Sequence, residues 1–127
     1  MKAVVLAAVL SAAAMGMAQA QDLAAGEQSF RKCGPCHAVG PEARNKIGPI
    51  LNGLDGRKSG TIPDYNYSEA NKKAEIIWGA DSFKEYIQSP MAKVPGTKMA
   101  FAGIKNQKEI GDLWAYLAQF KADGSKK

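Results

Sequence analysis

The apolar positions of the chain recur with helical spacing, most clearly near its C-terminal end. Between residues 107 and 120, one side of a helix carries only large apolar residues, namely Ile110, Leu113, Trp114, Leu117 and Phe120. Asn106 stands where an N-cap belongs, and Glu109 follows three residues later, as in a capping box. The pattern predicts a helix that starts after Asn106 and buries this face.

Three weaker helical segments precede it. In the stretch DLAAGEQSFRK, apolar or small residues recur at helical spacing up to Cys33, and Asp22 stands at the N-cap position. The stretch YSEANKKA predicts a short helix capped by Ser68. Residues 82–88 predict a third, with Asp81 as its cap and Pro90 as its end.

The mature chain contains no run of β-branched or aromatic residues that would make a sheet. The predicted fold class is therefore all-α. Residues 40–66 carry many glycines and prolines without periodicity, and so long a span without structure is unusual in a small domain. The span is explained if it wraps a rigid apolar cofactor that supplies part of the core.

The N-terminus indicates export. Lys2 is followed by an alanine-rich apolar run to about residue 17 and then by Ala18-Gln19-Ala20, which has the form of a signal-peptidase site. We expect residues 1–20 to be a signal peptide cleaved after Ala20, and residues 21–127 to be one periplasmic domain. This domain is basic, but it has no concentrated stripe of charge of the kind that binds nucleic acid.

Residues 33–37, Cys-Gly-Pro-Cys-His, carry the candidate chemistry. Cys33-Gly34-Pro35-Cys36 alone matches thioredoxin-like disulfide exchangers, but those proteins present the motif in a strand-turn-helix context that is missing here. Two cysteines and one histidine are too few for a structural zinc site. With His37 included, the motif is that of c-type haem attachment, in which Cys33 and Cys36 form thioethers and His37 is the proximal iron ligand.

The second axial ligand is less constrained by the residues alone. His37 is the only histidine of the chain, so the opposite position falls to Met, Lys, a small molecule or nothing. Met91 and Met99 are the two methionines of the mature chain, and their spacing does not choose between them.

Four segments beyond the haem motif carry a family resemblance. CGPCH, IGPILNGLDGRKSG, YSEANK followed by IIW, and VPGTKMAFAGIK resemble the class I cytochromes c in order and approximate spacing, above all mitochondrial cytochrome c and the exported bacterial cytochromes c2. The resemblance covers residues 21–127. It implies the small cytochrome c fold, with about four to five short helices and long loops around one covalently bound haem c. It also implies Met99 as the distal iron ligand.

The resemblance extends to further residues around the haem. The Pro49 loop would orient His37, and Tyr86 and Thr97 would lie on the distal side, with Phe101 near the exposed haem edge. A set of polar and aromatic side chains would solvate the propionates: Arg57, Tyr67, Asn71 and Trp78.

The resemblance also implies a contact between two helices, and three positions of this chain depart from the family pattern. Gly26 and Phe30 of the first helix would cross Leu113 and Tyr116 of the last. This chain departs from the family pattern at three positions: Pro35, Asn45 and Asp55.

Two axial protein ligands leave an iron without an open position, so the predicted function is single-electron transport and not catalysis. The resemblance implies a monomeric shuttle between a cytochrome bc complex and a terminal oxidase or a photosynthetic reaction centre. Lysines near the haem would meet the partner: Lys32, Lys46, Lys98 and Lys105. Lys121 and Lys126, in the C-terminal tail, would matter less. The competing hypothesis is a haem enzyme or ligand sensor with a labile sixth site.

Overall fold

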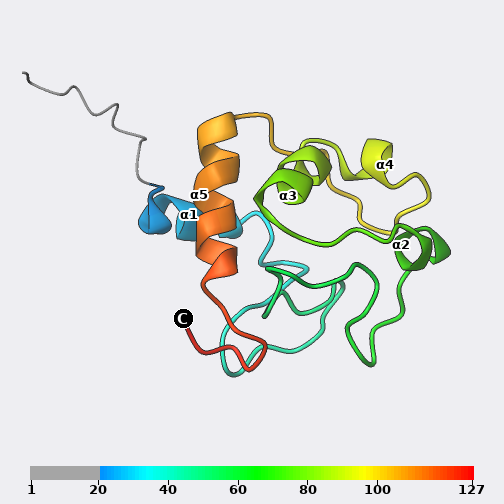
Figure 1. The fold of residues 1–127 in the computed structure, drawn as a ribbon, viewed down its shortest axis with the longest axis horizontal. Helices are drawn as coiled ribbons and strands as arrows, with labels where there is room; N and C mark the ends of the chain where they lie inside the picture. Colours follow the sequence, from blue (N-terminus) through cyan, green and yellow to red (C-terminus); the bar gives the residue numbers. More distant parts are fainter. Residues whose placement is uncertain (1–20) are drawn as a thin grey trace, which may run out of the picture.

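Helices from the two ends of the domain cross each other in the computed structural model, which describes residues 21–127 (Figure 1). Helix α1 spans Leu23–Phe30 and helix α5 spans Gln107–Ala118. At the crossing, a Cβ atom on Gly26 would lie 2.1 Å from the Asp112 carbonyl oxygen, so only glycine allows this approach. The rings of Phe30 and Tyr116 pack 5.6 Å apart. The predicted crossing is confirmed.

Side-chain caps start three helices as the sequence predicted. Asp22 accepts a hydrogen bond from Ala25 N at 3.1 Å at the start of α1, and Asn106 accepts one from Glu109 N at 3.0 Å at the start of α5. Ser68 accepts one from Asn71 N at 3.1 Å and starts α2, Glu69–Lys73.

The predicted start of the third helix is wrong by two residues. Helix α3 spans Ala80–Ile87 and its N-cap is Gly79, not Asp81. The Ser82 hydroxyl accepts a hydrogen bond from Gly79 N at 2.9 Å, so the third residue of the helix satisfies the cap. Pro90 does follow the end of α3, but it also opens the four-residue helix α4, Pro90–Lys93, which the sequence analysis did not predict.

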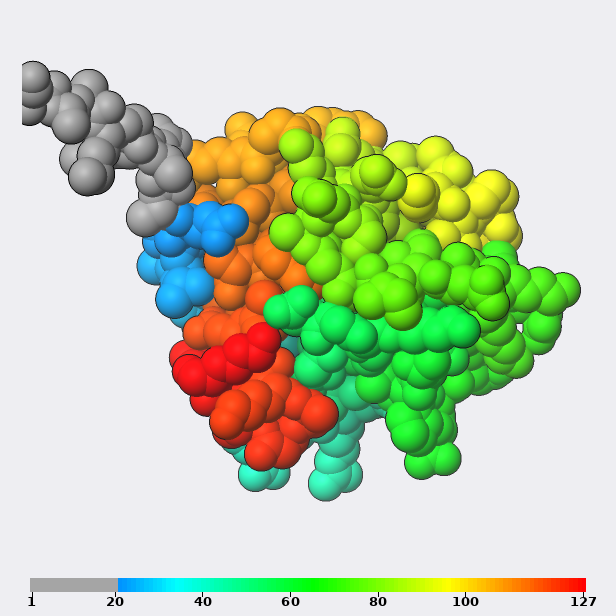
Figure 2. All heavy atoms as spheres, in the orientation of Figure 1, coloured from blue at the N-terminus to red at the C-terminus, as the bar shows by residue number. Residues whose placement is uncertain are grey.

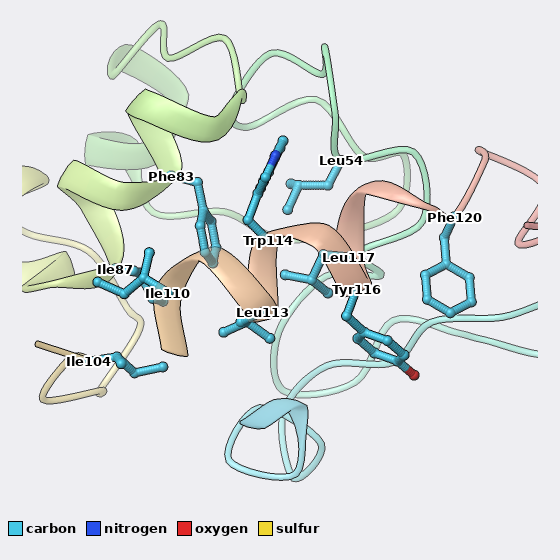
Figure 3. Close-up of a cluster of buried hydrophobic side chains, with 10 residues drawn as sticks. All are labelled: Leu54, Phe83, Ile87, Ile104, Ile110, Leu113, Trp114, Tyr116, Leu117 and Phe120. Carbon is cyan, nitrogen blue, oxygen red and sulfur yellow. The ribbon is translucent and has the colours of Figure 1, made fainter. Parts of the chain in front are cut away.

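The core forms where α3 and the 87–104 segment pack on α5 (Figure 3). Phe83 of α3 contacts Trp114 of α5 with ring centroids 5.3 Å apart, and Leu113 is fully buried. All five members of the predicted apolar face of α5 and its C-terminal extension are buried: Ile110, Leu113, Trp114, Leu117 and Phe120.

Loops make up much of the remaining chain. No strand occurs among residues 21–127, which contain only two isolated bridges, Lys58 with Ile77 and Phe120 with Lys126. The all-α class and the number of helices are confirmed. The segment after α5 folds back onto the molecule, as its red spheres show in Figure 2.

The signal peptide expected at residues 1–20 lies outside the described residues. In the part of the chain that is described, no helix is long and apolar enough to cross a membrane.

Candidate functional site

A cavity of about 270 Å³ lies between the 47–60 loop, α3, α5 and the 98–101 segment. The cavity brings together most of the site residues expected from the sequence: Lys32, Cys33, Cys36, His37, Pro49, Arg57, Tyr67, Asn71, Trp78, Tyr86, Lys98, Met99 and Phe101. Thr97, Lys46 and Lys105 are not part of its wall. Residues distant in the sequence therefore meet around one space.

The two cysteines sit on a tight turn that continues from α1. Cys33 N donates to Phe30 O at 2.8 Å, and His37 N donates to Cys33 O at 2.8 Å, so the turn is held at both ends. Both thiols are free and partly buried, and both line the cavity. This short turn places two thiols and an imidazole on the same wall.

The environment of Cys33 is unsuited to disulfide exchange. Burial raises the pKa of its thiol to about 11, although Lys32 opposes the shift. An attacking thiol in a disulfide exchanger needs a lowered pKa, because the thiolate is the nucleophile. The thiol stays protonated at neutral pH, which counts against the thioredoxin-like alternative.

The imidazole of His37 is fixed by the loop that faces it. Its Nδ1 lies 2.7 Å from Pro49 O, so Nδ1–H donates to the carbonyl and Nε2 keeps its lone pair. Gly48 packs directly on the ring, where a Cβ atom would lie 2.3 Å from Cε1. Burial lowers the pKa of His37, while the Pro49 carbonyl raises it. The neutral, oriented imidazole has the form that binds a metal.

A methionine lines the cavity as well. The Tyr86 hydroxyl donates to Met99 Sδ at 3.0 Å, and Tyr86 packs edge-on against Trp78 with ring centroids 4.9 Å apart. Thr97 Oγ1 accepts a hydrogen bond from Met99 N at 3.2 Å, which fixes the backbone. Met91, in contrast, is 56% exposed on α4 and does not line the cavity.

Polar side chains line one region of this mostly apolar wall. Arg57 donates from one nitrogen to Ile50 O at 3.0 Å and to Asn52 O at 3.1 Å. The Tyr67 hydroxyl accepts from Ile62 N at 3.1 Å. Among the described residues, Asn71 Oδ1 is the one buried side-chain polar atom without a hydrogen-bond partner.

These features fit a covalently bound haem. Two thiols, a neutral imidazole and a thioether are the donors that haem c uses, and the apolar wall suits a porphyrin. The cavity wall also carries donors that a buried carboxylate requires, namely the Arg57 guanidinium and the Asn71 amide NH2 group. The unpartnered Asn71 Oδ1 is an acceptor that the described protein atoms leave unsatisfied.

Two departures from the family pattern have local explanations. Asn45 accepts a hydrogen bond from Ile50 N at 2.8 Å and donates to Pro63 O at 3.2 Å, so it joins two parts of the loop. Asp55 is exposed and lies 3.3 Å from Lys127 Nζ. Nothing in the structure explains Pro35.

Several wall residues were not identified from the sequence as site residues. They are mostly apolar: Ile47, Leu51, Leu54, Phe83, Ile87, Leu113 and Leu117. The helical periodicity marked those on α3 and α5 as buried, but periodicity does not distinguish a protein core from a cofactor pocket. The Asn52 side chain, which bonds both Gly40 N and Gly40 O at 2.9 Å, carried no signal at all.

All four expected docking lysines are exposed, but each has a local partner. Lys32 pairs with Glu109, and Lys105 donates to Gln88 O. Lys46 Nζ donates to Gly34 O at 2.6 Å, and Lys98 Nζ donates to Asn66 O at 3.2 Å. Of the four, only Lys32 has its charge paired with a carboxylate.

Comparison with known proteins identifies the family of the chain. The family model described as Cytochrome c matches residues 23–121. A cytochrome c2 of Rhodoplanes tepidamans is 66% identical over 107 residues, which cover 84% of this chain and all of the relative. A cytochrome c2 of Blastochloris viridis is 54% identical over 127 residues, the full length of both chains.

A solved structure extends the likeness to the fold. Cytochrome cH from Methylobacterium extorquens superposes with a TM-score of 0.71 at 42% identity, covering 76% of this chain and 96% of that one. The resemblance seen in the sequence is confirmed. The chain belongs to the cytochrome c family, among the class I bacterial members that resemble cytochrome c2 and carry electrons on one covalently attached haem c.

Proposed function

We propose that this electron carrier works in the periplasm, after cleavage following Ala20, with His37 and Met99 as the axial ligands of its iron. It takes electrons from a cytochrome bc complex and passes them to a terminal oxidase or a photosynthetic reaction centre. It is not an enzyme. The relatives named cytochrome c2 support the role of carrier, and the net positive charge and exposed lysines of this chain support docking to acidic partners.

One observation carries the ligand assignment. His37 and Met99 line the same cavity, and each is held by a hydrogen bond, His37 to Pro49 O and Met99 from Tyr86. His37 has Nε2 free and Met99 has a sulfur lone pair free, so both can bind iron without losing these partners. A bound haem c supplies an iron that gains and loses one electron.

The protein side chains then limit the chemistry to electron transfer. With both His37 and Met99 bound, the iron would have no open position for oxygen or peroxide. Leu54, Phe83 and Leu113 make the cavity wall apolar, which would disfavour the extra positive charge of the oxidised state. Cys33 and Cys36 would anchor the porphyrin, and Arg57 and Asn71, which line the same cavity, would bind its carboxyl groups.

Lysines around the cavity set the encounter with the partner. Lys32 and Lys98 line it, and Lys46 precedes Ile47, which lines it as well. A local excess of positive charge steers an acidic docking site toward this face. Since Glu109 neutralises Lys32, Lys98 contributes more than Lys32 does.

Charge reversal tests the docking surface. Lys98→Glu should slow second-order electron transfer with the purified cytochrome bc complex and flatten its dependence on salt, because exposed charges are screened over about 8–10 Å near physiological ionic strength. Lys121→Glu is the matched control with the same change in net charge. Stopped-flow rates across a salt series that are equally sensitive to both changes would show that net charge, and not this surface, governs docking.

Ligand binding separates the carrier from the alternative with a labile sixth site. The reduced holoprotein should bind carbon monoxide slowly and incompletely, because Met99 occupies the position that the gas would take. Rapid and complete binding by the unaltered protein would favour the enzyme or sensor.

A further inference from the structure

The C-terminal segment, residues 119–127, forms a closed turn and not a loose tail. Lys127 N donates to Gln119 O at 2.8 Å, and Lys121 N donates to Ser125 O at 2.8 Å. Asp123 Oδ1 accepts from Ser125 N at 2.9 Å and from Ser125 Oγ at 2.6 Å, which closes the tip. We call residues 119–127 the C-terminal strap.

The strap packs against the loop that follows the haem motif (Figure 2). Gly124 is buried, and a Cβ atom on it would lie 2.2 Å from Gly40 O. Gly53 N donates to Phe120 O at 3.0 Å, and a Cβ atom on Gly53 would lie 3.0 Å from Ala122 Cα. Backbone therefore lies directly on backbone at two points, which few other residues would permit.

The loop under the strap also holds His37. The side chain of buried Asn52 bonds to Gly40 N and Gly40 O, both at 2.9 Å, so Gly40 links the Gly124 contact to Asn52. Leu51 N donates to Ala38 O at 3.1 Å, next to His37. Pro49, two residues before Leu51, presents the carbonyl that accepts from His37 Nδ1.

We propose that the C-terminal strap positions His37. By pressing Gly124 against Gly40, it keeps the 40–53 loop in the conformation that directs Pro49 O to His37 Nδ1. Gly124 and its strap are thus positioning elements, which act on the histidine through Asn52 and the loop. This inference rests on the proposed role of His37 as an iron ligand.

Gly124→Ala in the full-length holoprotein tests the proposal, with Gly56→Ala as its control. The two glycines have nearly the same positive φ, 85° and 84°, so alanine strains the backbone equally. Gly124 faces Gly40 at close range, while nothing lies within 4 Å of a Cβ on Gly56. Any effect of the first change beyond that of the second comes from the strap contact.

Two NMR readouts distinguish positioning from general loss of stability. Gly124→Ala should shift the His37 ring resonances and speed amide exchange at Gly40 and Leu51 at least tenfold, with little change at Ile104, whose amide bonds to Ile87 O at 2.9 Å elsewhere in the fold. Gly56→Ala should change neither. Equal losses of thermal stability with unchanged His37 resonances would overturn the proposal.

A milder variant covers the case in which Gly124→Ala does not fold. Asp123→Ala removes the two hydrogen bonds that close the tip of the strap and adds no atom near the loop. It should shift the His37 resonances and speed amide exchange at Gly40 and Leu51 by smaller amounts than Gly124→Ala does. An unaltered His37 spectrum in a loosened strap would also overturn the proposal. Failure of the proposed function looks different, because His37 of the unaltered ferric protein would then lack the large shifts of an iron ligand.

Discussion

The hydrogen bond from Tyr86 to Met99 should raise the reduction potential. The Tyr86 hydroxyl oxygen lies 3.0 Å from Met99 Sδ, and its O–H group draws electron density from the sulfur. A sulfur that donates less electron density to the iron would stabilise the oxidised state less, so the reduced state would be favoured. Only the difference in the strength of this bond between the two oxidation states changes the potential, and the net worth of a typical hydrogen bond, about 1 kcal/mol, sets the upper limit. For a one-electron couple, in which a tenfold change is 59 mV, this corresponds to about 40 mV. Tyr86→Phe removes the bond and keeps the ring.

An equilibrium redox titration at neutral pH checks the size and the sign. The potential of Tyr86→Phe should be lower than that of the unaltered protein, by up to about 40 mV. Tyr116→Phe is the matched control, because Tyr116 is also buried but packs on Phe30 and does not line the cavity. An unchanged or higher potential in Tyr86→Phe, or equal shifts in both variants, would refute the reasoning.

Three further predictions concern stability and assembly. Gly26→Ala should lower the free energy of unfolding by about 1–3 kcal/mol or more, since its Cβ would overlap the Asp112 carbonyl; thermal unfolding of the holoprotein measures it. Hydrogen bonds from Lys108 and from a backbone amide lower the pKa of Asp112, so Asp112→Asn should destabilise the protein most at neutral pH. This difference should shrink as the pH falls through the depressed pKa, and a difference constant with pH would contradict it. Cys33→Ser should reduce the yield of folded holoprotein, because the cofactor completes the core, and native helix content in the apoprotein by circular dichroism would argue against this.

Local chemistry explains what the sequence predicted well. Asp22, Ser68 and Asn106 cap helices through a side chain and a backbone amide three residues on, and such short-range contacts are visible as a pattern. The start of α3 was not predicted correctly, because the N-cap residue Gly79 has no side chain that would identify it. Ser82, inside the helix, supplies the capping hydrogen bond instead. Pro90 was correctly identified as a stop, but its second role as the first residue of α4 was not.

Contacts between distant segments explain the rest. Periodicity could not separate Met91 from Met99, because both lie in irregular or very short segments, and the burial that differs between them arises only in the folded chain. The strap was treated as a tail because its partner, Gly40, lies more than eighty residues earlier. Glycine pairs that touch through their backbones leave no periodic or charge pattern in a sequence.

The most direct test of the account is the ferric absorption spectrum of two methionine variants. Met99→Ala should abolish the weak band at the red end that comes from charge transfer between methionine sulfur and iron, and it should let carbon monoxide bind the reduced form. Met91→Ala removes the same side chain from the exposed surface of α4 and should leave the band intact. Loss of the band in Met91→Ala, with its retention in Met99→Ala, would contradict the assignment of Met99 as the axial ligand.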